Sequence, residues 1–192
     1  MTALELLRIR ARANRLANHR LHAAMEALAP GEFEAPRVGF FPSLAATLAH
    51  ILAVDTYYLA ALHREADMAL QWQRFTPPRG FAELVPRQRA SDERLIRFVE
   101  ALGETGADAE IVLDRGAARS PERVAHVLQH LDMHQTHHRG QAHAMLSSTS
   151  VRPPQLDEFL MPSDAHYRAT DMQLLGWREE DVYRQAASTA GS

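Results

Sequence analysis

The sequence of 192 residues contains no cysteine and no lysine. The absence of cysteine excludes disulfide bonds, thiolate metal ligands and a cysteine nucleophile. All 21 basic residues are arginine, and without a lysine amine the chain cannot carry Schiff-base chemistry or a phosphate-binding P-loop. Any chemistry must therefore come from histidine, carboxylate and hydroxyl groups or from a bound metal ion.

The chain also lacks an excess of positive charge and a long hydrophobic run. Its formal net charge is −3, with 46% hydrophobic and 23% charged residues, which is ordinary for a globular protein. This balance provides no electrostatic attraction to nucleic acid. We see neither a run long enough to span a bilayer nor a secretory leader. We therefore expect a cytoplasmic protein with no nucleic-acid or membrane partner.

Apolar residues recur at helical spacing in four long segments of the chain. These segments predict helices over residues 3–28, 43–71, 86–102 and 120–147. Ser43 is expected to cap the second helix and Gly103 to end the third. The clearest helix start is Ser120-Pro121-Glu122, which combines an N-cap serine, a proline at the first helical position and an acidic first turn. Residues 108–114 fit either a short strand or an extended crossover.

The remaining C-terminal segment has a different character. Residues 150–164 contain three prolines and are expected to form a wrapped loop. Short helices over 164–175 and 179–187 would follow, and the last few residues are expected to be disordered. Together these patterns predict an all-α fold in which residues 1–150 form a four-helix bundle. Residues 151–192 would be a short helical extension that packs on the bundle.

Six of the 11 histidines lie in the expected helix 120–147, where their spacing indicates a metal site. Four residues of an α-helix turn through roughly 400°, so His134 and His138 project from nearly the same face. Two imidazoles in this relation can bind one metal ion, as in helical zinc sites. The same geometry also allows the pairs His130/His134 and His134/His137. A third ligand would come from another helix, and His50 is the best candidate, because facing helices of bundles commonly build metal sites.

The residues around this histidine pair invite further expectations. Gln141 could orient a ligand or a bound water. Arg139 could hold an anion or pair with a carboxylate at a subunit surface. Gly140 is unusual inside a helix and would serve either close approach of a neighbour or simple packing. The other histidines are expected to be core or surface residues (His126, His130, His137, His143) or solvated (His19, His22, His63, His166).

Several segments resemble the signature of the DinB family. The most specific is LQHLDMHQTHHRGQ, residues 128–141, and FFPSL at 40–44 followed by TLAHILAVD at 47–55 belongs to the same pattern. Ala13-Asn14-Arg15-Leu16 and PPQLD at 153–157 also fit. The similarity covers roughly residues 3–160, and it departs from the family at Met133, where relatives often have asparagine.

The resemblance implies a four-helix bundle with an unusual order of helix directions, often dimeric. It also implies one divalent metal ion per chain, bound by His50, His134 and His138. Ligation by nitrogen alone suits zinc, nickel or iron. Characterised relatives include metal-dependent transferases and isomerases that use a low-molecular-weight thiol. We therefore expect a homodimeric, metal-dependent enzyme acting on a small molecule with such a thiol, its catalytic residues unknown. The alternatives are a metal-dependent hydrolase, a non-catalytic metal-binding or stress-response protein, and a bundle without a metal.

Overall fold

The computed structural model of the protein describes residues 2–157 and 161–183. Its long helices are α1 (Ala3–Met25), α2 (Leu44–Leu62), α4 (Phe81–Ala101) and α5 (Val124–Leu146). Its short elements are η1 (Met68–Leu70), α3 (Gln71–Arg74), η2 (Gly106–Asp108), β1 (Glu110–Asp114), β2 (Arg119–Arg123), η3 (Pro162–Asp164), α6 (Ala165–Leu175) and α7 (Glu179–Val182).

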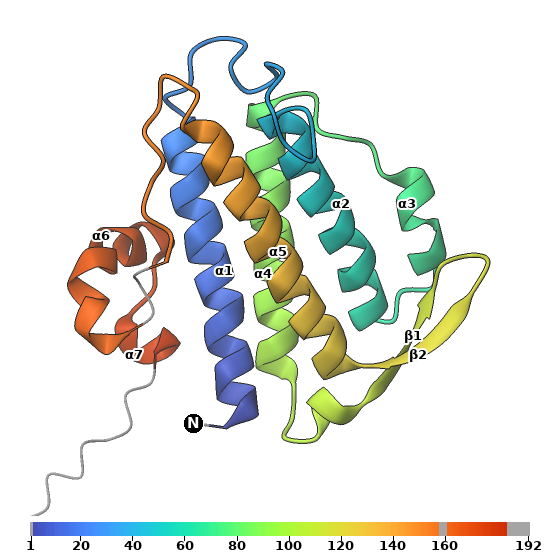
Figure 1. The fold of residues 1–192 in the computed structure, drawn as a ribbon. Coiled ribbons are helices and arrows are strands. Elements are labelled where there is room, and N and C mark those ends of the chain that lie inside the picture. The colour runs from blue at the N-terminus through green and yellow to red at the C-terminus, as the bar shows by residue number, and fades with distance from the viewer. Residues whose placement is uncertain (1, 158–160, 184–192) are drawn as a thin grey trace, which may run out of the picture.

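The four long helices pack side by side as a bundle, which confirms the expected all-α class. In Figure 1, α1 and α5 run in one direction and α2 and α4 in the other. The segment between α2 and α4, which contains α3, returns along the bundle before α4 begins, and this return makes α2 and α4 parallel. Each long helix contacts two neighbours, with α2 against α4 and α5, and α1 against α4 and α5.

Helix α2 lies in the interior of the bundle. Contrary to the expectation from the sequence, it is long and apolar enough to cross a membrane, but 72% of its apolar window is buried inside the protein. Buried leucines and isoleucine on α2 pack against α4 and α5, as in the core helix of a globular protein. Its start is the expected one, because the backbone N–H of Ala46 donates to Ser43 Oγ at 3.0 Å.

The end of α2 comes nine residues before the expected position. The helix ends at Leu62, and Arg64 adopts a left-handed conformation with φ of 56°. The N–H of Arg64 then bonds to the carbonyl of Ala61, and the N–H of Glu65 to that of Ala60. This is a Schellman motif, which satisfies the last carbonyls of the helix. The sequence hides it, because glycine usually occupies the left-handed position.

Helix α4 also differs from the expectation at both ends. It begins at Phe81 rather than near Pro86, which lies inside the helix. The extra turn is stabilised by burial, since the Phe81 ring packs on Phe33 at 5.3 Å and Leu84 is buried. At the other end the helix stops at Ala101, with an extended residue as its cap. Gly103 has no positive φ, so the expected glycine cap is absent.

The predicted start of the fourth helix is wrong. Ser120, Pro121 and Glu122 lie in β2, which pairs antiparallel with β1 in a hairpin. Helix α5 begins only at Val124, and no side chain caps it. The short strand considered for residues 108–114 is present, and pairing lets its residues Ile111 and Leu113 bury their side chains. Proline is tolerated because this two-stranded sheet has only edge strands.

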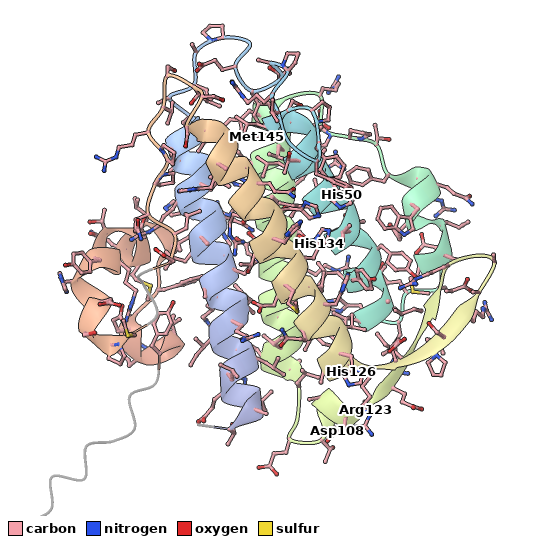
Figure 2. The ribbon with its side chains drawn as sticks, in the orientation of Figure 1. His50, Asp108, Arg123, His126, His134 and Met145 are labelled. Atoms are coloured by element: carbon pink, nitrogen blue, oxygen red, sulfur yellow. The ribbon has the colours of Figure 1, made fainter. Side chains whose placement is uncertain are left out.

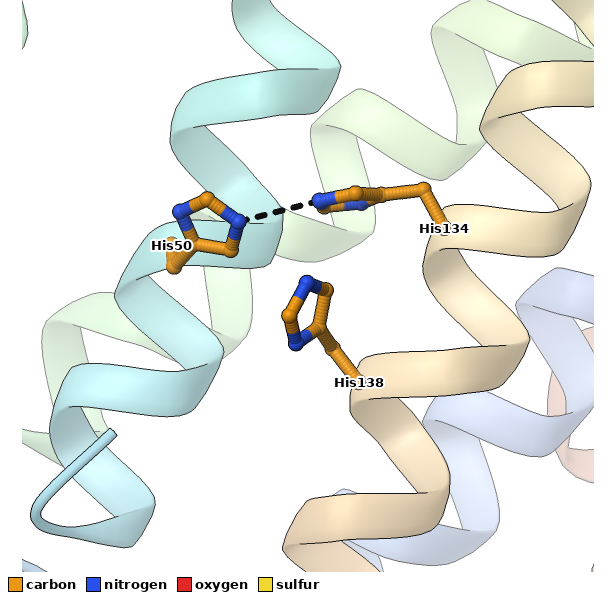
Figure 3. A group of neighbouring side chains, drawn as sticks. All are labelled: His50, His134 and His138. Carbon is orange, nitrogen blue, oxygen red and sulfur yellow. Dashed lines mark hydrogen bonds between the residues drawn. The ribbon is translucent and has the colours of Figure 1, made fainter. Parts of the chain in front are cut away.

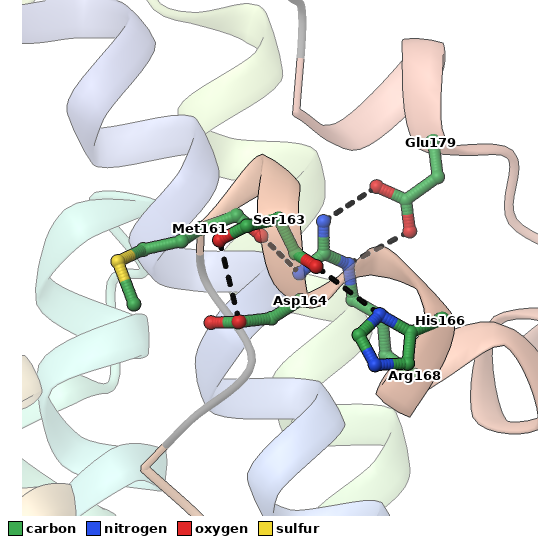
Figure 4. A network of polar contacts seen from close by, with 6 residues as sticks. All are labelled: Met161, Ser163, Asp164, His166, Arg168 and Glu179. Atoms are coloured by element: carbon green, nitrogen blue, oxygen red, sulfur yellow. Dashed lines mark hydrogen bonds and ion pairs between the residues drawn. The ribbon is translucent and has the colours of Figure 1, made fainter.

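The segment after α5 packs against α1. Met172, Val182 and Tyr183 form a small apolar cluster with Ile9 of α1. Arg168 is fully buried and makes two hydrogen bonds of 2.7 Å to the carboxylate of Glu179 (Figure 4). Such a bidentate pair fixes α6 against α7. Helix α6 confirms the short helix expected over 164–175. The second short helix, expected over 179–187, can be compared only up to residue 183, where the described part of the chain ends. The expected disorder of the last residues lies outside the described residues. The division at residue 150 stays a prediction.

A closed ring of buried hydrogen bonds joins all four long helices. Arg139 of α5 donates to the side-chain oxygens of Asn14 and Asn18 of α1, and both asparagines donate to Asp92 of α4. Gln88 of α4 donates both to Asp92 and to Asp55 of α2. Gln135 of α5 closes the ring between Asp55 and Arg139. Arg139 therefore lies in the bundle interior, and its expected place at a subunit surface is wrong.

Burial raises the pKa of Asp55 to about 7, because desolvation disfavours its charged form more than the hydrogen bond from Gln88 favours it. A carboxyl with a raised folded-state pKa contributes stability that is present at low pH and lost as the pH rises through the folded pKa. The loss of stability therefore begins near pH 3.8, the ordinary pKa of an aspartate, and is complete above about pH 7.

We expect Asp55→Asn to gain stability relative to the wild type as the pH rises from about 5 to 7. The difference in the free energy of unfolding should grow by up to about 1.4 kcal/mol per pH unit and then level off. Urea unfolding at pH 5, 6, 7 and 8 measures this difference, and the contributions of the histidines cancel in it. Asp108→Asn, at an exposed aspartate, is the control. A difference that does not change with pH would contradict the raised pKa.

Gly31 and Gly140 both have room for a side chain but differ in their backbone conformation. A Cβ at Gly140 or at Gly31 would meet no atom within 4 Å, so close approach of a neighbour does not explain Gly140. Gly31 has φ of +83°, whereas Gly140 is helical. We expect Gly140→Ala to raise the free energy of unfolding by about 0.5–1 kcal/mol and Gly31→Ala to lower it. Thermal denaturation of both variants tests this, and a destabilised Gly140→Ala would refute it.

Candidate metal centre

The structure brings His50, His134 and His138 together between α2 and α5. One ring nitrogen of each lies within 4.8 Å of one from each of the others, an arrangement that could hold a metal ion. Nε2 of His134 and Nε2 of His50 are 3.0 Å apart, and Figure 3 shows the three rings facing a common point. His134 and His138 project one helical turn apart from α5, and His50 faces them from α2.

The surroundings keep these imidazoles neutral, which is the form that binds a metal. Burial, together with the neighbouring His138 and His50, lowers the pKa of His134 to about 3. Burial also lowers the pKa of His50 and of His138 below the ordinary value. Within residues 2–157 and 161–183, no carboxylate joins the group as a counter-charge. The chemistry of the donor set therefore fits a divalent cation.

A hydrogen bond to Gln141 orients the His138 ring. Nδ1 of His138 donates to Oε1 of Gln141 at 2.8 Å, which leaves Nε2 of His138 as the nitrogen with a free lone pair. Gln141 in turn donates from Nε2 to His137 at 3.1 Å. Gln141 therefore holds the ring of His138, the candidate ligand one turn before it. Nδ1 of His134 is buried without a hydrogen-bond partner in the described part of the chain, so only Nε2 of this ring faces polar groups.

Aromatic side chains from the loop before α2 cover one side of the histidines. The Phe41 ring lies 4.5 Å from that of His50 and 5.5 Å from that of His138. Phe40 packs on Phe41 at 4.9 Å but is 78% exposed. The sequence alone assigned no role to Phe41. Its position two residues before Ser43, at the start of the helix that carries His50, could have indicated that it lies near the site. Phe41 therefore covers one side of the centre, whereas Phe40 projects into solvent.

A cleft of about 600 Å³ opens beside this aromatic cover. The loop residues 36–40 form one wall and α5 forms the other, where Gln141 and Met145 line it. The loop is fixed on α5 by Arg37, which donates to the carbonyl of Ser148 at 3.1 Å. A Cβ at Gly39 would overlap the terminal methyl group of Met145, so a larger residue there would require this side chain to move. The cleft adjoins the histidines through Gln141 and is large enough for a small molecule.

The other histidines of α5 do not join the group. The ring centroid of His130 lies 6.0 Å from that of His134, and the centroid of His137 lies 4.8 Å from that of His138. The ring nitrogens of His130 and His137 nevertheless lie outside the group formed by His50, His134 and His138. His126 lies at the far end of α5, near Arg123 and Asp108 (Figure 2). The alternative pairs His130/His134 and His134/His137 are thus not the ones that meet His50.

Among the histidines expected to be solvated, His22 is an exception. Its side chain is buried next to Phe81, and burial lowers its pKa to about 3. His63 and His166 are exposed as expected. His19 is half-buried, with Nε2 3.6 Å from a carboxylate oxygen of Asp171. The sequence could not show these differences, because they depend on which face of α1 packs against α4 and α6.

Comparison with known proteins agrees with the fold and with the histidine cluster. The model of the DinB family matches residues 6–172. The match extends beyond the resemblance seen in the sequence and includes most of α6. No curated protein matches the chain. Because the family model spans most of the sequence and the bundle carries the three-histidine group on α2 and α5, the chain belongs to the DinB family.

Proposed function

We propose that this protein is a metal-dependent enzyme that uses a small thiol in a transferase or isomerase reaction. The observation that carries the proposal is the convergence of His50, His134 and His138 within 4.8 Å. Three nitrogen ligands leave an open position, as catalytic metal sites do. Zinc, nickel and iron all suit such ligands. The proposal includes a small-molecule substrate, a homodimer and a cytoplasmic location, which stay predictions.

The residues of this chain have separate roles in that function. His50, His134 and His138 would hold the ion, and Gln141 keeps the His138 ring turned toward it. A divalent ion held by these residues would lower the pKa of a bound thiol and would so supply a nucleophile at neutral pH. Phe41 restricts water on one side of the centre. The cleft lined by Phe40 and Met145 would place the electrophilic substrate beside the thiol.

Two alternatives use the same site differently. A hydrolase would bind water instead of a thiol at the open position. A non-catalytic metal-binding or stress-response protein would close the coordination sphere with a fourth protein ligand, and His130 and His137 would be the candidates for it. Within the described ranges no fourth histidine or carboxylate joins the three. This favours an open position over a closed one, and the adjoining cleft favours a substrate.

We expect one divalent ion per chain in the untagged wild-type protein and loss of most of it in His134→Ala and His138→Ala. Each variant removes one of three ligands, and the remaining two bind a metal weakly. Mass spectrometry for metals on dialysed protein measures the content. His126→Ala, on the same helix but outside the cluster, is the matched control and should keep its metal. Nearly full metal content in both site variants would exclude the site.

The same proteins separate the enzyme from its alternatives. We expect the metal-loaded wild type and His126→Ala to consume an electrophile such as 1-chloro-2,4-dinitrobenzene with glutathione or another small thiol. Chelation and His134→Ala should abolish this turnover. Metal binding without turnover across a panel of thiols and electrophiles would favour the non-catalytic alternative. Ester hydrolysis without added thiol would favour the hydrolase.

The lowered pKa values predict how metal binding depends on pH. Protons compete for an imidazole only below its pKa, so the lowered values of His50, His134 and His138 shift this competition to more acidic pH. We expect the affinity for zinc to change little between about pH 8 and 6.5 and to fall only below the ordinary imidazole range. Calorimetric titration at each pH tests this, with the isolated peptide 128–141 as the solvated control. A protein that loses affinity at the same pH as the peptide would contradict the prediction.

A further inference from the structure

A second cleft lies on another side of the bundle, between α1, α4 and the turn that follows α6. Its volume is about 360 Å³. Three arginines line it, Arg15 from α1 and Arg89 and Arg97 from α4. Leu174 and Trp177 provide an apolar wall. The cleft therefore combines several positive charges with an apolar surface.

Arg15 is the unusual member of this group. Its side chain is only 7% exposed, and within the residues that the structure describes it makes no hydrogen bond and no ion pair. Its guanidinium nitrogens are not fully buried and keep contact with solvent in the cleft. A largely buried cation without a bonded counter-ion is still costly, and burial lowers the pKa of Arg15. Most buried charges in proteins are paired. A ligand that supplied the missing anion would remove this cost.

The acidic groups near Arg15 are already bonded to other residues. Asp92 accepts hydrogen bonds from Asn14, Asn18 and Gln88 in the buried ring. Glu93 pairs with Arg89 at 2.8 Å. On the α6 side, Asp171 pairs with Arg20 at 2.5 Å and lies 3.6 Å from His19. None of these carboxylates reaches the Arg15 guanidinium within ion-pair distance.

The charge of the cleft is therefore positive. Arg15, Arg89 and Arg97 contribute three positive charges and Glu93 one negative charge, which leaves +2. His19 also lines the cleft, and burial lowers its pKa, so it adds no charge at neutral pH. Arg97 is exposed and has no ion pair in the described part of the chain, so it is available to a ligand. Arginines bind carboxylate and phosphate oxygens in a bidentate manner.

We infer that this cleft binds a small organic anion, whose phosphate or carboxylate head contacts Arg15 and Arg97 and whose apolar body packs on Trp177 and Leu174. The head group would supply the counter-charge that Arg15 lacks. The volume suits a ligand with one aromatic ring, at the small end of known binding pockets. Arg15 and Arg97 are carried by α1 and α4, whereas the three histidines are carried by α2 and α5. The inference is therefore independent of the proposed metal chemistry.

The test measures binding of phenyl phosphate and phenylacetate to the full-length protein by calorimetry and by the shift of its unfolding temperature. The protein is first stripped with a chelator and dialysed, so that no anion can bind through a metal ion. We expect at least one of the two probes to bind and to raise the unfolding temperature. Inorganic phosphate should bind at least about tenfold more weakly than phenyl phosphate, because it lacks the apolar body. Absence of binding by both aryl probes would overturn the inference, and equal binding of inorganic phosphate would overturn the role of the apolar wall.

Variants assign the binding to this cleft. Arg15→Met and Arg97→Met should each weaken binding of the aryl probe by about tenfold or more, since each removes a charged hydrogen-bond donor. Arg152→Met, at an exposed arginine outside the cleft, is the matched control and should bind like the wild type. His134→Ala should also bind the probe normally, which separates this site from the metal centre. Unchanged binding in Arg97→Met and Arg15→Met would refute the site.

Arg15→Met also provides a readout that does not need a ligand. If the arginine lacks a counter-ion, an apolar side chain of similar length should leave the unfolding temperature of the ligand-free protein equal or higher. The aryl probe should then raise the unfolding temperature of the wild type but not that of the variant. A variant that is strongly destabilised without ligand would show that Arg15 is satisfied within the fold and would overturn the inference. Arg97→Met, at an exposed position, tests the binding whatever the result for Arg15.

Discussion

The structure depends on one constraint, which is that the charges buried at the centre of the bundle must all be satisfied at once. Arg139 is separated from Asp92 and Asp55 by amide side chains that relay its hydrogen bonds, and the ring closes only if every helix has one rotation about its axis. An apolar core alone would tolerate a range of rotations, whereas a polar network with missing partners costs several kcal/mol. The ring therefore specifies how the four helices face one another.

This constraint also positions the candidate metal centre. Gln135 and Arg139 of the ring directly follow His134 and His138 in α5. Because successive residues of a helix are rotated by about 100°, directing the ring residues into the bundle interior turns the two histidines toward α2. Asp55, which belongs to the ring of hydrogen bonds, lies on α2, and the same helix carries His50 five residues earlier. The histidines meet because the network beside them fixes the rotation of both helices. Arg15 lies near the same network, but Asp92 already accepts hydrogen bonds there from Asn18 and Gln88 and does not pair with it.

Local sequence signals failed where a tertiary contact opposed them. Ser120-Pro121-Glu122 has the composition of a helix start, but pairing with β1 buries Ile111 and Leu113 and so favours a strand. Arg64 ends α2 in a conformation that glycine usually takes, because the hydrogen bonds of the Schellman motif compensate for its cost. Where no tertiary contact opposed the local signals, the predictions from them were confirmed, as for the Ser43 cap of α2 and for helix α6. His22 shows the same rule, since its burial depends on the packing of α1.

The amino-acid sequence by itself determined the helical class of the protein, the face that His134 and His138 share on α5, and the family. These follow from periodicity along one helix and from motif spacing, which need no knowledge of neighbouring helices. Only the tertiary structure decided that His50 reaches the pair, that Arg139 is buried in a polar ring, and that Arg15 faces a cleft without a counter-ion. Helical spacing defines the direction of a side chain relative to its own axis, whereas packing and the satisfaction of buried polar groups decide which helix it faces.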